Sequence, residues 1–354
     1  MEIKKDIQKT ISSPINNTIT EEEFNTVLRI IAPGTGLRKA LDGILSSGRG
    51  AIIVIENEFL PPILDGGFKV NCKFSYQKLI ELSKMDGAMI LSKDLKRINQ
   101  ANVLLTPDSK IPTFETGTRH KAAERTATHI SGLVIAISER KKEIVLFYKN
   151  KRYKIRDTSE IFRRVNESLQ VLEKQKDLFE MYLETLDKLE LRNYINLGQA
   201  IKTIQRGKVL KKISEELQRY LIELGNEGTL LKTRLKELLL GVDKETNLII
   251  KDYTNTNLNR AILTLNKLSY EELLDKENIL QALNHANLRE IVVVSGWRIL
   301  SKTSLSEPEV ENLVREAKVL EKITSANIDS DFTSISKDRF SLLKVELERL
   351  KIGI

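Results

Sequence analysis

Three consecutive basic side chains, Arg119, His120 and Lys121, stand at the start of a segment with helical character. Thr118 is placed to cap the start of this helix. The first turn of a helix carries a partial positive charge and favours Asp and Glu, so each cation there costs roughly a few tenths of a kcal/mol or more. An anion that binds the free backbone N–H groups of this turn offsets that cost. The segment Gly117–Arg125 therefore predicts an anion site of phosphate size.

The triplet Asp86-Gly87-Ala88 lies between a predicted helix and an apolar strand. Asp-Gly is among the commonest turn dipeptides, so in isolation a turn explains it. A functional interpretation needs a partner, and the basic helix start is the obvious one. Nucleotidyl transfer requires a divalent metal that neutralises phosphate charge, and a carboxylate that holds the metal or takes a proton from the attacking hydroxyl. Asp86 suits either role, and Gly87 lets a ligand approach the backbone closely.

The other candidate residues indicate no further chemistry. His129 and His285 lie at no spacing typical of a metal site. The stretch Leu64-Asp65-Gly66-Gly67 indicates a turn, although close backbone approach is an alternative. The chain contains neither a Walker A sequence nor Gly-x-Gly-x-x-Gly, so the P-loop and Rossmann modes of nucleotide binding are unsupported.

The elements that must position these side chains lie in residues 1–157, where helical and strand patterns alternate. Short apolar runs predict strands over residues 51–55, 87–91, 133–137 and 144–148. Helical spacing predicts helices over residues 22–31, 37–45 and 75–84 and after Thr118. Interleaved helices and strands predict an α/β domain, with a mixed sheet flanked by helices.

After residue 157 the composition changes. Apolar residues recur at helical spacing from about Thr158 to Leu240, and helices continue to about His285. This pattern predicts an all-α spine over residues 158–290, followed by a small helical C-terminal module over residues 291–354. We interpret the apolar stripes of the spine as helix packing and nothing more.

The distribution of charge points to an anionic ligand. The 354 residues include 57 Lys and Arg and 49 Asp and Glu, a net charge of +8. Residues 84–156 hold 16 Lys and Arg against 7 Asp and Glu, whereas residues 291–354 hold 10 of each sign. A basic region attracts nucleotides or nucleic acid. The alternative for Arg140–Lys142 and Lys149–Arg156 is that they form solvated loop and strand edges.

The composition predicts a cytoplasmic protein. A hydrophobic content of 41% and a charged content of 30% are typical of ordinary soluble chains. The single cysteine, Cys72, excludes an intramolecular disulfide and any Cys-cluster metal site. The apolar runs are too short to cross a bilayer, and the amino-terminal residues have no apolar core, so we expect neither membrane association nor a signal peptide.

The segment Met85–Ala88, followed by Gly117–Arg125, resembles the DGA and RHR motifs of the diadenylate cyclases. Further segments resemble one DNA-binding branch of that family: Leu28–Leu37, Asp65–Gly67, Ser92–Ile98, Lys251–Tyr253 and Gly296–Lys302. Two motifs at the expected separation inside matching flanks form a specific signal, and the similarity covers nearly the whole chain.

The resemblance implies an enzyme that condenses two ATP molecules into cyclic di-3′,5′-AMP, releases pyrophosphate and requires Mg²⁺ or Mn²⁺. It also implies that each active site forms between two facing cyclase domains of a homo-octamer, whose helical spine leads to a DNA-binding helix-hairpin-helix module. Asp86 would bind the metal and help to activate the 3′-hydroxyl, and Arg119 and His120 would take part in catalysis. The implied nucleotide-binding positions are Gly87, Ala88, Leu105, Thr118, Arg119, His120, Lys121 and Ala122.

Two departures from the family pattern limit these expectations. Lys121 stands where the third motif residue is Arg; lysine keeps the charge but lacks the planar fork that grips phosphate, so we expect less precise phosphate positioning. Ser334 and Ser336 stand at the two glycine positions of the DNA-binding hairpin, where serine adopts a left-handed conformation poorly. Together with the neutral charge of residues 291–354, they predict weakened DNA binding. Lys121 also leaves open an alternative, a non-enzymatic DNA-binding or nucleotide-sensing scaffold oligomer.

Overall fold

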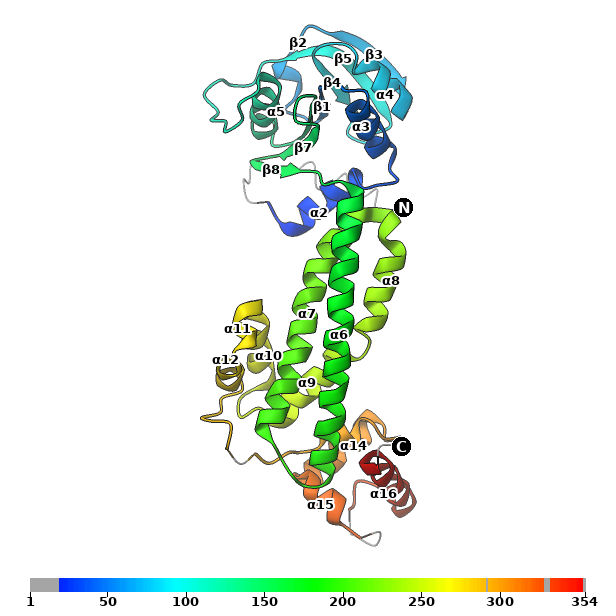
Figure 1. Cartoon of the computed structure of the whole chain (residues 1–354), viewed down its shortest axis with the longest axis vertical. Helices are drawn as coiled ribbons and strands as arrows, with labels where there is room; N and C mark the ends of the chain where they lie inside the picture. Colours follow the sequence, from blue (N-terminus) through cyan, green and yellow to red (C-terminus); the bar gives the residue numbers. More distant parts are fainter. Residues whose placement is uncertain (1–18, 291, 328–331, 353–354) are drawn as a thin grey trace. The chain divides into compact units, whose positions relative to one another are not determined.

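A computed structural model describes residues 19–290, 292–327 and 332–352 (Figure 1). The chain divides into two compact units. The first unit comprises the residues up to Val165 together with Arg219–Leu231, and the second comprises Asn166–Gln218 and the residues from Lys232 onward. The three-part division at residues 157/158 and 290/291 stays a prediction.

The first unit is built on a mixed sheet, in which the described residues form eight strands in the order β2-β5-β4-β1-β6-β7-β8, with β3 paired to β5. Strand β1 runs parallel to β4, and the other neighbouring pairs are antiparallel. The strands are β1 (Ala51–Ile55), β2 (Leu64–Asp65), β3 (Phe68–Lys73), β4 (Ala88–Leu91), β5 (Arg97–Leu105), β6 (Leu133–Ser138), β7 (Glu143–Tyr148) and β8 (Lys151–Lys154). The prediction of an α/β domain with a mixed sheet is confirmed.

Helices cover both faces of this sheet because side chains alternate along each strand. Ile53 and Ile55 of β1 pack in one buried cluster with residues of α2, α3 and α4, whereas Ile52 and Val54 pack on the opposite face with Ala123 and Ala127 of α5. The helices are α2 (Glu21–Ile30), α3 (Gly36–Ser46), α4 (Tyr76–Leu82) and α5 (Thr118–His129). Figure 1 shows α3 and α5 on opposite sides of β1.

Strands β3 and β5 were not predicted from the sequence. The segment of β5 contains Asn99, Gln100 and Asn102, which are residue types with little preference for strands. Its register with β4 is irregular, and Asn102 has a positive φ of 56°. Pairing with β4 on one side and β3 on the other therefore forms this strand where local preference is weak.

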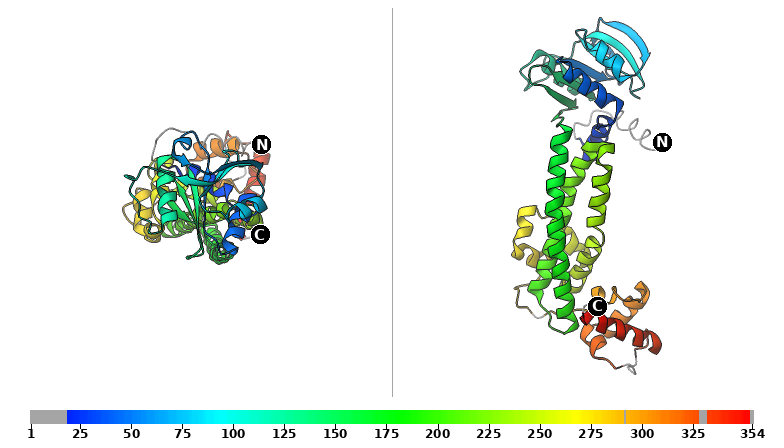
Figure 2. Two further views of the ribbon diagram at one scale, coloured as in Figure 1. Left: turned by 90° about the horizontal axis from the view of Figure 1, so that it is seen from above. Right: turned by 45° about the vertical axis from the view of Figure 1, so that its right-hand side comes forward.

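The described chain after β8 is helical, as predicted. A short turn joins α6 (Thr158–Leu191) to α7 (Leu197–Leu224), so these long helices run antiparallel, and they lie side by side in Figures 1 and 2. The shorter helices are α8 (Thr229–Leu238), α9 (Val242–Tyr253), α10 (Leu258–Lys267), α11 (Tyr270–Leu274), α12 (Lys276–Ala282), α13 (Trp297–Leu300), α14 (Glu307–Ala317), α15 (Leu320–Ser325) and α16 (Lys337–Ile352). One hydrophobic cluster includes residues of α6, α7, α9, α10 and α12 to α16.

A buried ionic cluster lies inside this helical core. Arg298 of α13 is 0% exposed and contacts the carboxylates of Asp187 and Glu190 on α6, the latter at 2.6 Å. Tyr253 of α9 donates to Glu190 at 2.8 Å. The carboxylate of Asp252 accepts the backbone N–H of Arg298 at 2.9 Å. The cluster links α6, α9 and α13, because Arg298 pairs with two carboxylates of α6 and Asp252 of α9 accepts backbone N–H groups at the start of α13.

The segment Phe332–Ser336 leads into α16 and contains both serines of the predicted hairpin. Neither Ser334 nor Ser336 is among the described residues with positive φ. The strain expected for serine in a left-handed conformation therefore does not arise here. Within the described part of the chain, no helix is long and apolar enough to cross a membrane.

Candidate nucleotide-binding site

The candidate site lies at the amino end of α5. Gly117 precedes the first helical turn with φ −87° and ψ 142°, and it makes no side-chain capping bond. The prediction that Thr118 caps this helix is wrong, because Thr118 is its first helical residue. The first turn of this described helix contains no acidic residue. Since the first N–H groups of a helix have no acceptor within it, the turn offers donors beside its cations.

Arg119 lies over the amino end of β1. A Cβ atom at Gly50 would come within 2.1 Å of its Nη1 atom, so the glycine makes room for the guanidinium. Arg119 is partly buried and forms no hydrogen bond or ion pair with any residue that the structure describes. A partly buried guanidinium without a carboxylate partner favours an anionic ligand.

His120 is buried, with 8% of its surface exposed. Its ring packs edge-on against Phe147, at 6.3 Å between ring centroids and 78° between planes. Burial lowers the pKa of His120, and the carboxylates of Glu115 and Glu143 act in the opposite direction. The Nε2 atom is buried without a hydrogen-bond partner among the described residues. A buried ring nitrogen of this kind is available to a ligand in the adjacent cavity.

Asp86 lies at the same edge of the sheet as this helix start. Ile52 of β1 pairs with Ala88 of β4 in parallel register, so Gly50 and Asp86 occupy matching positions before neighbouring strands. Such strands are about 4.8 Å apart. Asp86 is exposed and makes no hydrogen bond or ion pair within the described ranges. The fold thus brings the DGA-like and RHR-like segments to one edge.

Gly87 is required by the backbone at this edge. Its φ is +85°, and a Cβ atom there would come within 2.7 Å of the carbonyl carbon of Asn102. Ala88 pairs with Val103, so Leu105 lies near the same edge and is partly buried. The side chain of Ala88 is 1% exposed and belongs to the core beneath α5, which leaves only its backbone for a ligand.

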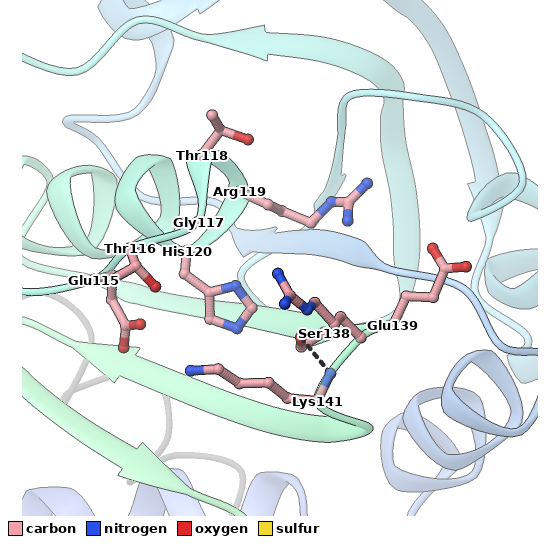
Figure 3. Close-up of a pocket in the computed structure, with 10 residues that line it drawn as sticks. Glu115, Thr116, Gly117, Thr118, Arg119, His120, Ser138, Glu139 and Lys141 are labelled. Atoms are coloured by element: carbon pink, nitrogen blue, oxygen red, sulfur yellow. Dashed lines mark hydrogen bonds between the residues drawn. The ribbon is translucent and has the colours of Figure 1, made fainter.

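A cavity of about 630 Å³ opens beside the start of α5 (Figure 3). Figure 3 shows the side chains of Arg119 and His120 at the start of α5 and those of Ser138 and Lys141 at the neighbouring turn. Its volume lies in the range of cofactor sites. The lining residues are Glu115, Thr116, Gly117, Thr118, Arg119, His120, Ser138, Glu139, Arg140 and Lys141.

The cavity includes some of the predicted site residues and omits others. Thr118, Arg119 and His120 line it. Lys121 and Ala122 are partly buried on α5 but do not line it. The strand-edge residues Asp86, Gly87, Ala88 and Leu105 lie outside its lining as well. The roles of all these residues in binding and catalysis stay predictions.

Sequence reasoning missed one wall of the cavity, which Ser138–Lys141 form at the turn between β6 and β7. Lys141 N–H donates to Ser138 Oγ at 3.1 Å, which shapes this turn. The only sequence signal was the polar and basic run that ends the apolar strand, and it was equally compatible with a solvated loop. Ala51 pairs with Ile137 across the sheet, so the turn meets the amino end of β1.

The second basic run, Lys149–Arg156, is largely used in structural contacts. Lys149 is 5% exposed and pairs with Glu23 at 3.2 Å. Lys154 pairs with Glu143 at 3.0 Å, and Arg152 pairs with Glu115. These cations are thus unlike Arg119, because carboxylates of the same unit already balance their charge.

The described residues contain no group of three or more His, Cys, Asp or Glu side chains that could hold a metal ion by themselves. Mg²⁺ usually keeps several waters and binds through one or two carboxylates and the phosphates of its substrate. The exposed carboxylate of Asp86, free of partners within the described ranges, fits such a ligand.

Comparison with known proteins assigns the class of this fold and site. Residues 38–152 match the family model described as DisA bacterial checkpoint controller nucleotide-binding. Residues 155–291 match the model of the DisA bacterial checkpoint controller linker region. The α/β unit is therefore a nucleotide-binding domain of this class, and a linker region follows it.

The relatives extend the match to nearly the whole chain. The DNA integrity scanning protein DisA of Clostridium acetobutylicum is 37% identical, with 92% of this chain and 94% of the relative covered. The proteins of the same name from Fusobacterium nucleatum and Acetivibrio thermocellus are 35% and 38% identical, with 95% and 94% of this chain and 99% and 95% of the relatives covered. A solved structure of DacA from Staphylococcus aureus is 24% identical over 41% of this chain and 95% of that chain, with a TM-score of 0.30. The chain belongs to the DisA family of DNA integrity scanning proteins.

Proposed function

We propose that this protein is a diadenylate cyclase that condenses two ATP molecules into cyclic di-3′,5′-AMP and releases pyrophosphate. The observation that carries this proposal is the cavity at the start of α5, where Arg119 and the buried Nε2 of His120 have no partner among the described residues. Its position in a domain that matches a nucleotide-binding family supports a triphosphate as the anion.

In this proposal the residues of the chain bind and orient the phosphates. The free N–H groups of the first turn of α5 and the Arg119 guanidinium hold phosphate oxygens, as helix termini and arginines do elsewhere. His120 donates a hydrogen bond from its ring, and Arg140 and Lys141 add positive charge from the turn between β6 and β7, where Lys141 Nζ lies 3.8 Å from Glu143. Asp86 would hold Mg²⁺ or Mn²⁺, which supplies neutralisation of the phosphate charge.

The reaction joins the 3′-oxygen of each ATP to the α-phosphorus of the other, and each step breaks a bond to pyrophosphate. Asp86 assists removal of the proton from the attacking 3′-hydroxyl. Since two ATP molecules must face one another, we propose that two copies of the cyclase domain meet, within an octamer. We further propose a cytoplasmic location. We also propose DNA binding through the C-terminal module, which the names of the relatives support, and we expect it to be weak because residues 291–354 carry no net charge.

Turnover by the purified full chain tests this proposal. With ATP and either metal, we expect one cyclic dinucleotide for every two ATP consumed, measured by chromatography and mass spectrometry. The Asp86→Asn variant should lose this activity while it still folds. A wild-type protein that binds ATP but forms no product with either metal would favour the alternative, a nucleotide-sensing scaffold.

A further inference from the structure

The hairpin before α16 contains two consecutive backbone donors that face a carboxylate of α14. Thr333 N–H donates to Glu316 Oε1 at 2.8 Å, and Ser334 N–H donates to Glu316 Oε2 at 3.0 Å. The Thr333 hydroxyl donates to Oε1 as well, at 3.0 Å. Both oxygens of one carboxylate are therefore bound by adjacent residues of the hairpin.

A second carboxylate on the same helix binds the start of α16. Arg339 Nε and Nη2 donate to Glu309 Oε1 and Oε2 at 3.2 and 3.0 Å. Glu309 and Glu316 are two helical turns apart, so they share one face of α14. Hydrogen bonds from Arg339 and Ser306 lower the pKa of Glu309 to about 2, and those from Ser334 and Thr333 lower that of Glu316 to about 2. Both carboxylates are thus charged at neutral pH.

Successive backbone N–H groups in a turn form a nest that binds oxyanions, including phosphate. Here the nest already holds an oxyanion from its own chain. Glu316 is exposed at the surface, so its side chain can leave the hairpin without opening the core. Glu316 therefore occupies the two backbone donors and is at the same time accessible to solvent.

We propose that Glu316 is a built-in anion that closes the hairpin to nucleic-acid phosphates, with Glu309 holding the neighbouring arginine in the same way. A phosphate must displace Glu316 before it reaches the N–H groups of Thr333 and Ser334. This inference concerns the proposed DNA contact alone. It is independent of the cyclase reaction, so ATP turnover does not enter its test.

The test compares full-length variants in their binding to a fluorescent DNA duplex over a series of salt concentrations. Glu316→Gln should bind at least about tenfold more tightly than the wild type, because it frees donors to a charged phosphate and removes a repulsive charge. One added phosphate contact should also steepen the slope of log K against log salt by about 0.9.

Glu311→Gln is the matched control, because it removes the same charge from α14 while Glu311 pairs with Arg315 of the same helix rather than with the hairpin. Equal affinity and slope in Glu316→Gln and Glu311→Gln would overturn the proposal. Amide hydrogen exchange of the wild-type protein is a second test, and it does not depend on whether a variant folds. DNA should leave the exchange of Thr333 and Ser334 unchanged, and protection of these amides by DNA with Glu316 in place would also overturn it.

Discussion

Two glycines shape the candidate site at the scale of single residues. Gly87 adopts a positive φ where the backbone of β5 comes very close, and Gly50 leaves the space in which the Arg119 guanidinium lies. At each position, a side chain would occupy space that a neighbouring residue fills. Substitutions at the two positions should therefore differ in kind, one acting on stability and the other on binding.

Gly87→Ala should destabilise the protein more than Gly66→Ala. Gly66 also has a positive φ, of 63°, but a Cβ atom there would meet nothing within 4 Å. The control should cost about 1 kcal/mol for the backbone alone. Gly87→Ala adds a clash with Asn102 and should cost roughly 1–3 kcal/mol more. Chemical denaturation measures both, and equal midpoints would show that the close approach is relaxed at no cost.

Gly50→Ala should weaken ATP binding about tenfold or more while it changes stability by less than about 1 kcal/mol. The new Cβ displaces the end of the flexible Arg119 side chain, which loses its position against the phosphates. Isothermal titration checks the affinity. In an Arg119→Ala background the same substitution should add little, because the two changes remove one interaction. Additive losses would place the effect of Gly50 elsewhere.

His120 should make stability depend on pH. Because burial lowers its pKa in the folded state, the unfolded chain binds its proton first as the pH falls below the ordinary value near 6.5. The free energy of unfolding should thus be higher at pH 7.5 than at pH 5.5 by a contribution that His120→Gln lacks. Thermal unfolding of both proteins at the two pH values measures it. An identical pH dependence in the variant contradicts this assignment.

At the scale of elements, local patterns predicted the helices α2 to α5 but only the strands β1, β4, β6 and β7 among the eight described strands of the first unit. The apolar run Ala51–Ile55 forms β1 with the predicted bounds, because a short, fully apolar run is typical of a buried strand. Strand β5 escaped prediction because its polar residues acquire strand structure only by pairing with β3 and β4. The role of the turn Ser138–Lys141 could not be predicted for the same reason, because only the pairing of strands in the sheet places this turn at the cavity beside α5.

The ionic cluster that links α6, α9 and α13 should be a strong determinant of stability. Glu190→Ala leaves the buried Arg298 short of one partner and should cost roughly 3–5 kcal/mol. Glu173→Ala removes a carboxylate from an exposed ion pair with Arg234 and should cost at most about 1 kcal/mol. Denaturant titration of the two variants compares them. A similar small cost for both would mean that water or a neighbouring carboxylate compensates Arg298.

At the scale of the whole molecule, the proposed reaction requires more than one chain. Each first unit contains a single copy of the motifs Asp86-Gly87-Ala88 and Gly117–Arg125, whereas two ATP molecules must react with one another. Assembly would thus be a condition of catalysis rather than a means of storage or stability.

Turnover per chain should therefore fall when the protein is diluted below the concentration at which its copies associate. Light scattering coupled to gel filtration gives the association state, and product formation at the same concentrations gives the turnover. Constant activity of a species shown by scattering to be a single chain would contradict the requirement for two facing domains.

The sequence by itself determined the expectation of phosphate and metal binding at the two motifs, the α/β and helical parts of the chain and the concentration of positive charge around α5. These follow from residue type and short-range periodicity, which act within a few residues along the chain. Only the tertiary structure decided that β1 and β4 lie side by side, that Gly50 accommodates Arg119 and that Ser138–Lys141 close the cavity. It also decided that Glu316 occupies the hairpin. Such contacts join residues distant in sequence, and their geometry depends on sheet register and helix packing that no local pattern encodes.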